Sequence, residues 1–269
     1  MAITVRLKLM KLCFSTLGCS DRSLDQILSL AKNYRIPAIE IRGIDGVLDN
    51  SQIKVFSKNS LGLTSETFKA WGISPIVLGT SCSFHSPEKY EKAVFEGITS
   101  IKIAESLGAP YIRVFGDRLT EGSTDRIISG LSELCSVSPK VSVLLEVHGD
   151  YNTEETLCPI TEKMRNRENF GLIWDIEHTH KPYGNGWDKF YSVFRPYIKH
   201  VHIKDRSDKI QALCLVGEGN VPVRQIAKRL IGDGYDGYFS LEWEKKWHPE
   251  LPEIEAALDS FIIEMTGVE

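Results

Sequence analysis

The sequence predicts a single (β/α)8 TIM barrel, and three observations support this fold class. First, short apolar runs alternate with longer amphipathic stretches from the start of the chain to its end. Second, eight such units follow one another, the number that closes a parallel barrel. Third, potential metal ligands stand at or just past the ends of several apolar runs. In a barrel, these strand ends form the mouth that carries the active site.

The expected strands are short, rich in Val, Ile and aromatic residues, and often bounded by Gly, Pro or Asp. Pro75 falls inside the third strand and removes a ladder donor, so we expect an irregular start there. The strands are expected at residues 11–16, 38–43, 73–80, 111–117, 141–148, 171–176, 199–204 and 238–243.

Amphipathic stretches between the strands predict the helices. At 23–34, apolar residues recur at helical spacing and Ser23 can cap the first turn. The stretch 87–108 is the longest and ends in Gly108, which suits a left-handed stop. A further helix is expected at 251–265. By contrast, 178–187 is rich in Gly and Pro and predicts an exposed loop.

A chain of 269 residues with 42% hydrophobic residues can bury a substantial core. No shift in composition marks a boundary, so residues 1–269 are expected to form one domain. Met10 begins a segment that would open a barrel well, which makes residues 1–9 a candidate N-terminal extension. A doubly wound open sheet is the alternative fold. It would need fewer strands or an extra domain, and no GxGxxG follows the first strand.

Composition also bears on the partners. The formal net charge of −4 leaves no electrostatic footprint for a nucleic acid or an anionic membrane. No apolar run approaches the ~20 residues needed to span a bilayer. The six cysteines include no CxxC pair, so we expect reduced thiols and a cytoplasmic protein. Self-association into a homo-oligomer stays open.

Four segments in the second half carry the potential metal ligands. Strand alternation places Glu146 and His148 on one face, and a glutamate in so apolar a run is costly to bury unless it is paired or bound to a cation. Each residue could be structural by itself, but ligands at the ends of four successive strands predict a site. The segments are LLEVHG with Glu146 and His148, IWDIEHTH with Asp175 and His178, HVHIKD with His200, His202 and Asp205, and SLEWE with Glu242.

Within HVHIKD, His202 lies nearer the strand's end and is the better ligand, whereas His200 is expected to be a hydrogen-bonded core histidine. Arg113, in an earlier strand, either reaches the site or forms a salt bridge in the barrel. The preferred ligands form an oxygen-rich, hard donor set that suits one divalent ion: Mn²⁺, Mg²⁺ or Co²⁺, with Zn²⁺ as an option. They are Glu146, Asp175, His202 and Glu242.

Such an ion can bind adjacent carbonyl and hydroxyl oxygens of a sugar and stabilise an enediolate. Glu146 and Glu242 would then face each other across the substrate. One would remove the proton next to the carbonyl, and the other would supply it on the opposite face.

The ordered segments resemble the sugar-phosphate isomerase/epimerase family of xylose-isomerase-like barrels, from about Met10 onward. The strongest marks are HVHIKD, the GEGNVP at 217–222 and the terminal GYFSLEWEKKW. The resemblance implies one divalent metal on the four ligands named above, with both glutamates as proton-transfer residues. It also implies substrate-binding roles for a further set, of which the last two are the weaker inferences: His178, His148, Lys204 and Arg206. Lys204 could instead pair with Asp205.

The predicted function is therefore a metal-dependent isomerase or epimerase of a small sugar or keto-sugar, with phosphorylation of the substrate left open. A dehydratase or lyase using the same metal site, with His178 or His148 as the acid, is the alternative. An endonuclease of the same fold would need an Asp-x-His just ahead of the GEG turn, where this chain has ALCLV, so no nucleic-acid partner is expected. The remaining alternative is a barrel that has lost its chemistry and binds a sugar.

Overall fold

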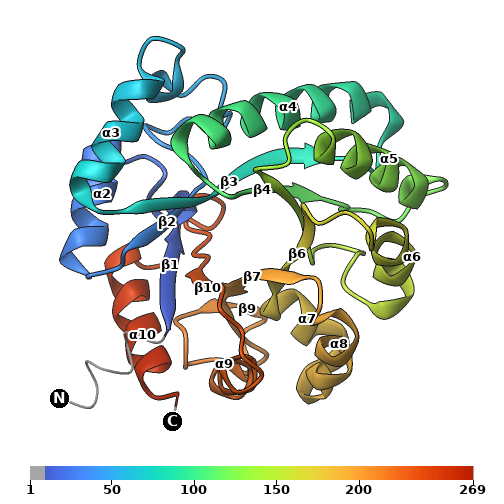
Figure 1. The fold of residues 1–269 in the computed structure, drawn as a ribbon. Helices are drawn as coiled ribbons and strands as arrows, with labels where there is room; N and C mark the ends of the chain where they lie inside the picture. Colours follow the sequence, from blue (N-terminus) through green and yellow to red (C-terminus); the bar gives the residue numbers. More distant parts are fainter. Residues whose placement is uncertain (1–9, 269) are drawn as a thin grey trace.

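The computed structural model describes residues 10–268, and the candidate extension at 1–9 lies outside them. Within this range, eight parallel strands close into one barrel in the order β1–β10–β7–β6–β5–β4–β3–β2 (Figure 1). The predicted single (β/α)8 barrel is confirmed, and each expected strand is present to within a few residues. The strands are β1 (Lys11–Ser15), β2 (Ala38–Ile41), β3 (Ser74–Ser83), β4 (Tyr111–Phe115), β5 (Ser142–Glu146), β6 (Phe170–Asp175), β7 (Ile198–Ile203) and β10 (Tyr238–Leu241).

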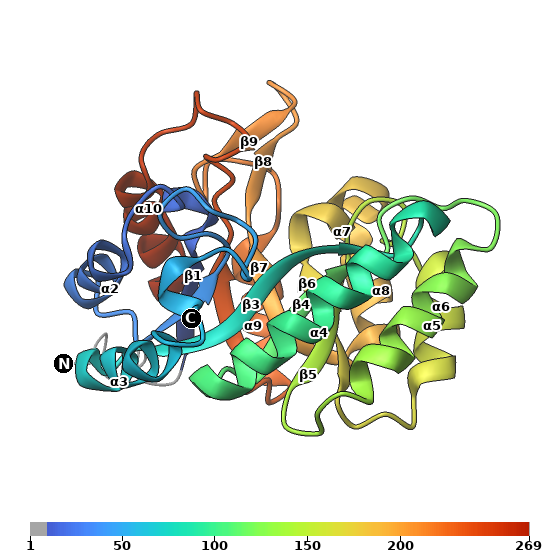
Figure 2. The same cartoon turned by 90° about the horizontal axis from the view of Figure 1, so that it is seen from above.

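The irregularity expected at Pro75 is present. Ile39 of β2 pairs with Pro75, but the next residue, Glu40, pairs with Val77, so the register shifts by one residue at this point. A proline cannot donate to the ladder, which accounts for the break. β3 then continues as a long strand alongside helix α4 (Figure 2).

Helices surround the barrel (Figure 1). Ser23 forms a capping box with Gln26, and Gly108 ends the longest helix at φ 75°, both as the sequence predicts. The helices are α2 (Leu24–Asn33), α3 (Leu61–Trp71), α4 (Tyr90–Leu107), α5 (Ser123–Cys135), α6 (Glu154–Met164), α7 (Ile176–Tyr183), α8 (Trp187–Phe194), α9 (Val223–Gly232) and α10 (Ile254–Thr266), with 3-10 turns η1 (Thr16–Cys19), η2 (Lys54–Phe56), η3 (Pro87–Lys89) and η4 (Gly184–Gly186). None of those within residues 10–268 is both long and apolar enough to cross a membrane.

The prediction of an exposed loop at 178–187 is wrong, because α7, η4 and the start of α8 occupy it. The Asp175 side chain accepts the first backbone N–H groups of α7. Pro182 removes the donor that would bond the carbonyl of His178, and the Asn152 side chain supplies that bond instead at 3.2 Å. Trp187 is only 8% exposed and packs on Trp174 of β6. A distant amide and tertiary packing therefore offset the helix-breaking residues.

Two features of the barrel position the site. Below the mouth, an apolar cluster fills the barrel interior; it includes Ala38, Leu144 and Ile173, two residues before Glu40, Glu146 and Asp175. Strand alternation puts the later residue of each pair on the same inward face, one layer higher.

Beside the mouth, β8 (Asp205–Ser207) and β9 (Ala212–Cys214) form an antiparallel hairpin that the sequence did not predict (Figure 2).

Candidate metal centre at the barrel mouth

Glu146, Asp175, His202 and Glu242 meet at the carboxyl end of the barrel. Each offers one ligand atom, and these atoms all lie within 4.8 Å of one another. β5, β6 and β7 carry the first three, Asp175 lies directly opposite His202 in the register, and Glu242 follows β10. All four side chains are buried. The barrel thus brings together the four residues that the sequence analysis selected as ligands.

The donor atoms of this cluster are poorly satisfied by the protein. Glu146 Oε2, Asp175 Oδ2 and His202 Nδ1 are buried, and none has a hydrogen-bond partner within residues 10–268. Arg113 Nη1 is 3.2 Å from the first oxygen and Lys204 Nζ is 2.7 Å from the second, but neither contact has hydrogen-bond geometry. Buried acceptors without donors are costly. The donor set therefore fits a divalent cation, which carboxylates and one imidazole would hold.

Glu40 of β2 orients the histidine of this cluster. His202 Nε2 lies 2.9 Å from Glu40 Oε2, so Nε2 donates to Glu40 and Nδ1 faces the carboxylates. Burial lowers the pKa of His202, but Glu242, Glu40 and Glu146 outweigh it and raise the pKa well above its usual value, so Nδ1 also holds a proton that a metal would displace. His200 Nε2 lies 3.1 Å from the same oxygen, which confirms the expectation of a hydrogen-bonded core histidine. Sequence reasoning missed Glu40. The signal was available, because Glu40 interrupts the apolar run AIEI just as Glu146 interrupts its own.

Arg113 of β4 takes both roles that the sequence left open. It is buried inside the barrel, and its Nη1 lies 2.9 Å from Glu242 Oε1 and 3.2 Å from Glu146 Oε2. Its guanidinium thus forms salt bridges with both glutamates of the site.

Lys204 also points into the cluster. Its Nζ lies 2.6 Å from Glu242 Oε2 and 2.7 Å from Asp175 Oδ2, and it also pairs with Glu244. Burial lowers the pKa of Lys204, but these carboxylates outweigh it and raise the pKa well above its usual value. The suggested pairing with Asp205 is wrong. Asp205 instead accepts backbone N–H groups from the loop that follows β9, those of Gly217, Gly219 and Val221.

Two imidazoles border the carboxylates. The rings of His148 and His178 have centroids 4.2 Å apart, and His148 also meets the ring of Phe115 edge-on. Burial and the positive charge of Lys204 lower the pKa of both histidines, which favours neutral imidazoles at neutral pH. Both histidines lie close enough to Lys204 to be affected by its charge, and their contact with a substrate stays a prediction.

Arg206, which the sequence analysis assigned to substrate binding, is engaged by other parts of the protein. It lies on β8, and its Nη2 donates to the backbone oxygen and side-chain Oε1 of Gln211. Its Nη1 is 3.7 Å from the buried Glu177. The hairpin and α7 therefore hold its guanidinium, and a substrate contact by Arg206 stays a prediction.

The two glutamates proposed for proton transfer differ in their environments. Burial and the nearby Glu242 raise the pKa of Glu146 to about 8. Burial acts on Glu242 in the same direction, but His202 and Lys204 outweigh it and hold the pKa of Glu242 well below its usual range. In the metal-free protein one carboxyl is thus protonated and the other ionised at neutral pH. Carboxyl pairs separated in this way can act as acid and base.

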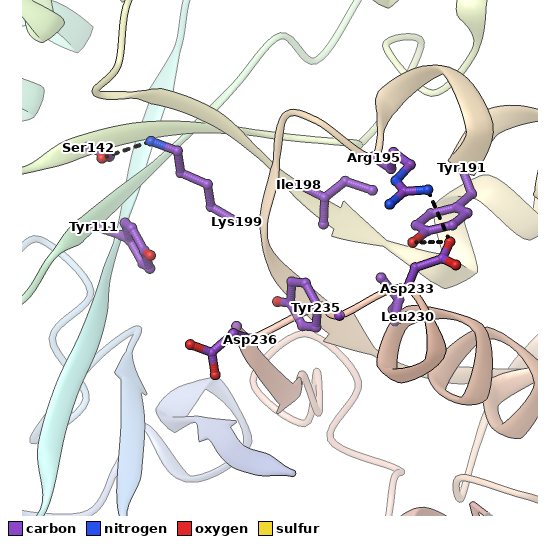
Figure 3. Close-up of a pocket in the computed structure, with 12 residues that line it drawn as sticks. Tyr111, Ser142, Tyr191, Arg195, Ile198, Lys199, Leu230, Asp233, Tyr235 and Asp236 are labelled. Carbon is purple, nitrogen blue, oxygen red and sulfur yellow. Dashed lines mark hydrogen bonds and ion pairs between the residues drawn. The ribbon is translucent and has the colours of Figure 1, made fainter. Parts of the chain in front are cut away.

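A cavity of about 460 Å³, whose lining residues Figure 3 shows, lies at the opposite end of the barrel. Its walls include Tyr111, Ser142 and Ile198, at the starts of β4, β5 and β7. Its charged side chains have protein partners, as in the pair of Arg195 with Asp233 at 3.4 Å. Barrel chemistry is carried at the carboxyl ends of the strands, so this cavity is separate from the candidate metal centre.

The chain is a closed parallel barrel, and the carboxylate–imidazole cluster at its mouth could hold a metal ion. This chain belongs to the xylose isomerase-like TIM barrel family, whose sequence model matches residues 29–264. A comparison with curated proteins gave no match.

Three solved structures illustrate the likeness. The first is a probable 3-DHS dehydratase, AsbF, from Bacillus anthracis: 16% identity, 94% of this chain and 98% of that one, TM-score 0.76. A D-tagatose 3-epimerase-like protein has 22% identity, covers 96% and 98%, and scores 0.75. A xylose isomerase-like barrel from Mycobacterium smegmatis, in complex with magnesium, has 15% identity, covers 96% of each chain, and scores 0.68. Identities this low establish the fold alone.

Proposed function

We propose that this protein is a divalent-metal-dependent isomerase or epimerase of a small sugar or keto-sugar. The observation that carries the proposal is the convergence of Glu146, Asp175, His202 and Glu242 at the barrel mouth, where three buried ligand atoms form no hydrogen bond within residues 10–268. Structural neighbours that are named as an epimerase-like protein and as a magnesium complex support it. Mn²⁺, Mg²⁺ or Co²⁺ suits the donors best.

When bound, the ion would act as a Lewis acid on the substrate's oxygens and favour the enediolate. The chain's own residues would move the proton. Glu242, held ionised by Lys204 and His202, is suited to remove the proton next to the carbonyl. Glu146, the other glutamate of the cluster, would return a proton on the opposite face. Arg113, which contacts both carboxylates, would hold their geometry during the exchange.

A dehydratase of a keto-sugar is the second candidate, and His148 and His178 favour it. Both imidazoles are half-buried, their ring centroids lie 4.2 Å apart, and charges of the cluster act on both. Expulsion of a hydroxyl from the enediolate requires an acid at the leaving oxygen, and an imidazole at this place can shuttle that proton. One solved neighbour is named as a probable dehydratase.

A nuclease is the weaker reading. The stretch ahead of the GEG turn forms β9 and the residues that follow it. Within residues 10–268, this stretch adds no side chain to either cluster of ligand-type groups. Asp205, on the neighbouring strand β8, accepts backbone N–H groups instead. Ligand-type groups in residues 10–268 converge in two clusters, and both contain His202. This supports one ion, not a multi-zinc centre.

The test is solvent exchange. Manganese-loaded enzyme in D₂O is given a panel of small keto-sugars, and deuterium at the carbon next to the carbonyl is followed by NMR. We expect Glu146→Gln and Glu242→Gln each to slow exchange by ~10²-fold or more. The control is Glu250→Gln in the last loop, an exposed glutamate away from the cluster. Exchange at the wild-type rate in both variants would rule out the two-glutamate mechanism. Loss of water from the product would select the dehydratase.

A further inference from the structure

Arg42 is a buried arginine without an acidic partner. It directly follows β2 at the barrel mouth and is 6% exposed. Its Nη1 donates to the carbonyl of Leu48 at 3.0 Å and its Nη2 to Ser81 Oγ at 2.9 Å. Among residues 10–268, no carboxylate lies within 4.0 Å of its guanidinium nitrogens. A buried charge with only neutral partners is costly unless something else compensates it.

The surroundings of Arg42 increase this imbalance. A Cβ on Gly79 would lie 2.7 Å from Arg42 Cδ and 3.3 Å from Arg113 Nη2, so the two arginines converge over this glycine of β3. Arg113 is already paired with glutamates of the cluster. Burial and Arg113 lower the pKa of Arg42 to about 10, which leaves it protonated at neutral pH. Two cations therefore lie side by side, and only one is neutralised by carboxylates in contact with it.

The carboxylates that act on Arg42 do so from a distance and are otherwise engaged. They are Glu96, Glu242 and Glu146. Glu96 accepts the backbone N–H of Ser81 at 2.6 Å. Glu242 and Glu146 belong to the candidate metal centre, and a bound divalent cation would take up their charge. Arg42 Nη1 and Nη2 each bond one neutral oxygen, so each keeps a second N–H for which residues 10–268 supply no acceptor.

A cavity of about 330 Å³ shares Ser81 with this arginine, although Arg42 itself does not line it. Ser81 lines it, together with Ser83 and His85 at the end of β3 and two lysines of the segment that follows, Lys89 and Lys92. Neither lysine forms an ion pair within the described residues. Of its two acidic side chains, Glu96 is held by Ser81 and Asp117 lies 3.6 Å from His85. The cavity therefore offers hydroxyl and ammonium donors beside the Arg42 fork.

We propose that Arg42, with the Ser81 hydroxyl, binds an anionic group of the substrate, a carboxylate or a phosphate, on the β2–β3 side of the mouth. A guanidinium presents two parallel donors that match either anion. This inference rests on the proposed function and narrows it. The substrate is a sugar acid or a sugar phosphate, and its oxygens would lie at the metal centre while its anionic end reaches Arg42.

Three probes of similar size test the proposal by calorimetry on the manganese-loaded protein: glycerol 3-phosphate, glycerate and neutral glycerol. We expect at least one anionic probe to bind about 10-fold or more tightly than glycerol, and Arg42→Met to remove about that factor. Arg195→Met is the matched control, because Arg195 lies at the opposite end of the barrel. The probe that depends on Arg42 identifies the anion as phosphate or carboxylate.

A second variant tests the charge without touching the arginine. Ser81→Asp places a carboxylate beside Arg42 Nη2, so it should compete with the ligand and lower its affinity about as much as Arg42→Met. Arg42→Met removes the buried charge and Ser81→Asp pairs it with a carboxylate. The Tm should therefore be unchanged or higher in both variants. A structural arginine would instead give a lower Tm in Arg42→Met.

Binding of both anions no tighter than that of glycerol, or wild-type affinity in Ser81→Asp, would overturn the proposal. Metal binding is measured separately. If the protein takes up no Mn²⁺ but still binds an anion through Arg42, the proposed function fails and this inference stands.

Discussion

Glu40 Oε2 lies 2.9 Å from His202 Nε2, and this contact decides which nitrogen of the histidine faces the carboxylate cluster. The two residues are 162 positions apart in the sequence, and the closure of the barrel brings them together. A carboxylate behind a ligand histidine fixes its tautomer and raises its basicity.

Replacing Glu40 should therefore weaken metal binding without touching a proposed ligand. We expect Glu40→Gln to lower the affinity for Mn²⁺ by ~10–100-fold, the usual cost of losing such a partner. Calorimetry on the metal-free protein measures this, and circular dichroism checks the fold. Ser240→Ala is the control, since Ser240 contacts the same Glu40 oxygen at 3.4 Å but is not a ligand. Equal affinities in Glu40→Gln and the wild type would show that Glu40 only fills space.

Asp175 has two separable roles. Its Oδ1 caps α7 through the N–H groups of Glu177 and His178, while its Oδ2 faces the cluster. Asparagine caps as well as aspartate, so Asp175→Asn should reduce metal affinity sharply and leave α7 intact. Asp175→Ala should also lower the free energy of unfolding of the metal-free protein by about 1 kcal/mol more than Asp175→Asn. Urea denaturation compares the two, and an equally stable pair would argue against the cap.

Metal binding should depend on pH through Glu146. Burial and Glu242 raise the pKa of Glu146 to about 8 in the metal-free protein, so near pH 7 this carboxyl carries a proton. A metal must displace that proton, and also the proton on His202, where Glu242, Glu40 and Glu146 outweigh burial and raise the pKa well above its usual value. Affinity should therefore rise with pH across the range from 6 to 8. Calorimetry in buffers of different ionisation enthalpy counts the proton released. An affinity that is flat between pH 6 and 8, with no proton release, would contradict the raised pKa.

Asp205 should be essential for stability although it is not in the ligand cluster. Its carboxylate accepts the N–H groups of Gly217, Gly219 and Val221, and its loss leaves these donors unpaired. We expect Asp205→Ala to lower the free energy of unfolding by about 3 kcal/mol, as for a lost buried network. Chemical denaturation measures this, with the exposed Asp208→Ala as the control. A loss below that of the control would contradict the anchoring role.

The sequence by itself determined the barrel and the gathering of the proposed ligands. Alternating apolar runs and amphipathic stretches specify strands and helices locally, and a capping serine such as Ser23 marks where a helix starts. Once a parallel barrel is predicted, side chains at the strand ends must share one mouth. Glu146, Asp175, His202 and Glu242 could therefore be placed together without coordinates.

Only the tertiary structure decided what surrounds those ligands. The helix at 176–183 depends on an amide from Asn152, and Asp205 is engaged by a loop more than ten residues away. Glu40 and Arg113 come from the first half of the barrel, and they acquire their partners His202 and Glu242 only when the ring closes. The alternation of apolar and polar residues along a strand predicts which side chains the strand buries. The partner that compensates each buried charge is set by strands far apart in the chain, and that pairing exists only in the folded barrel.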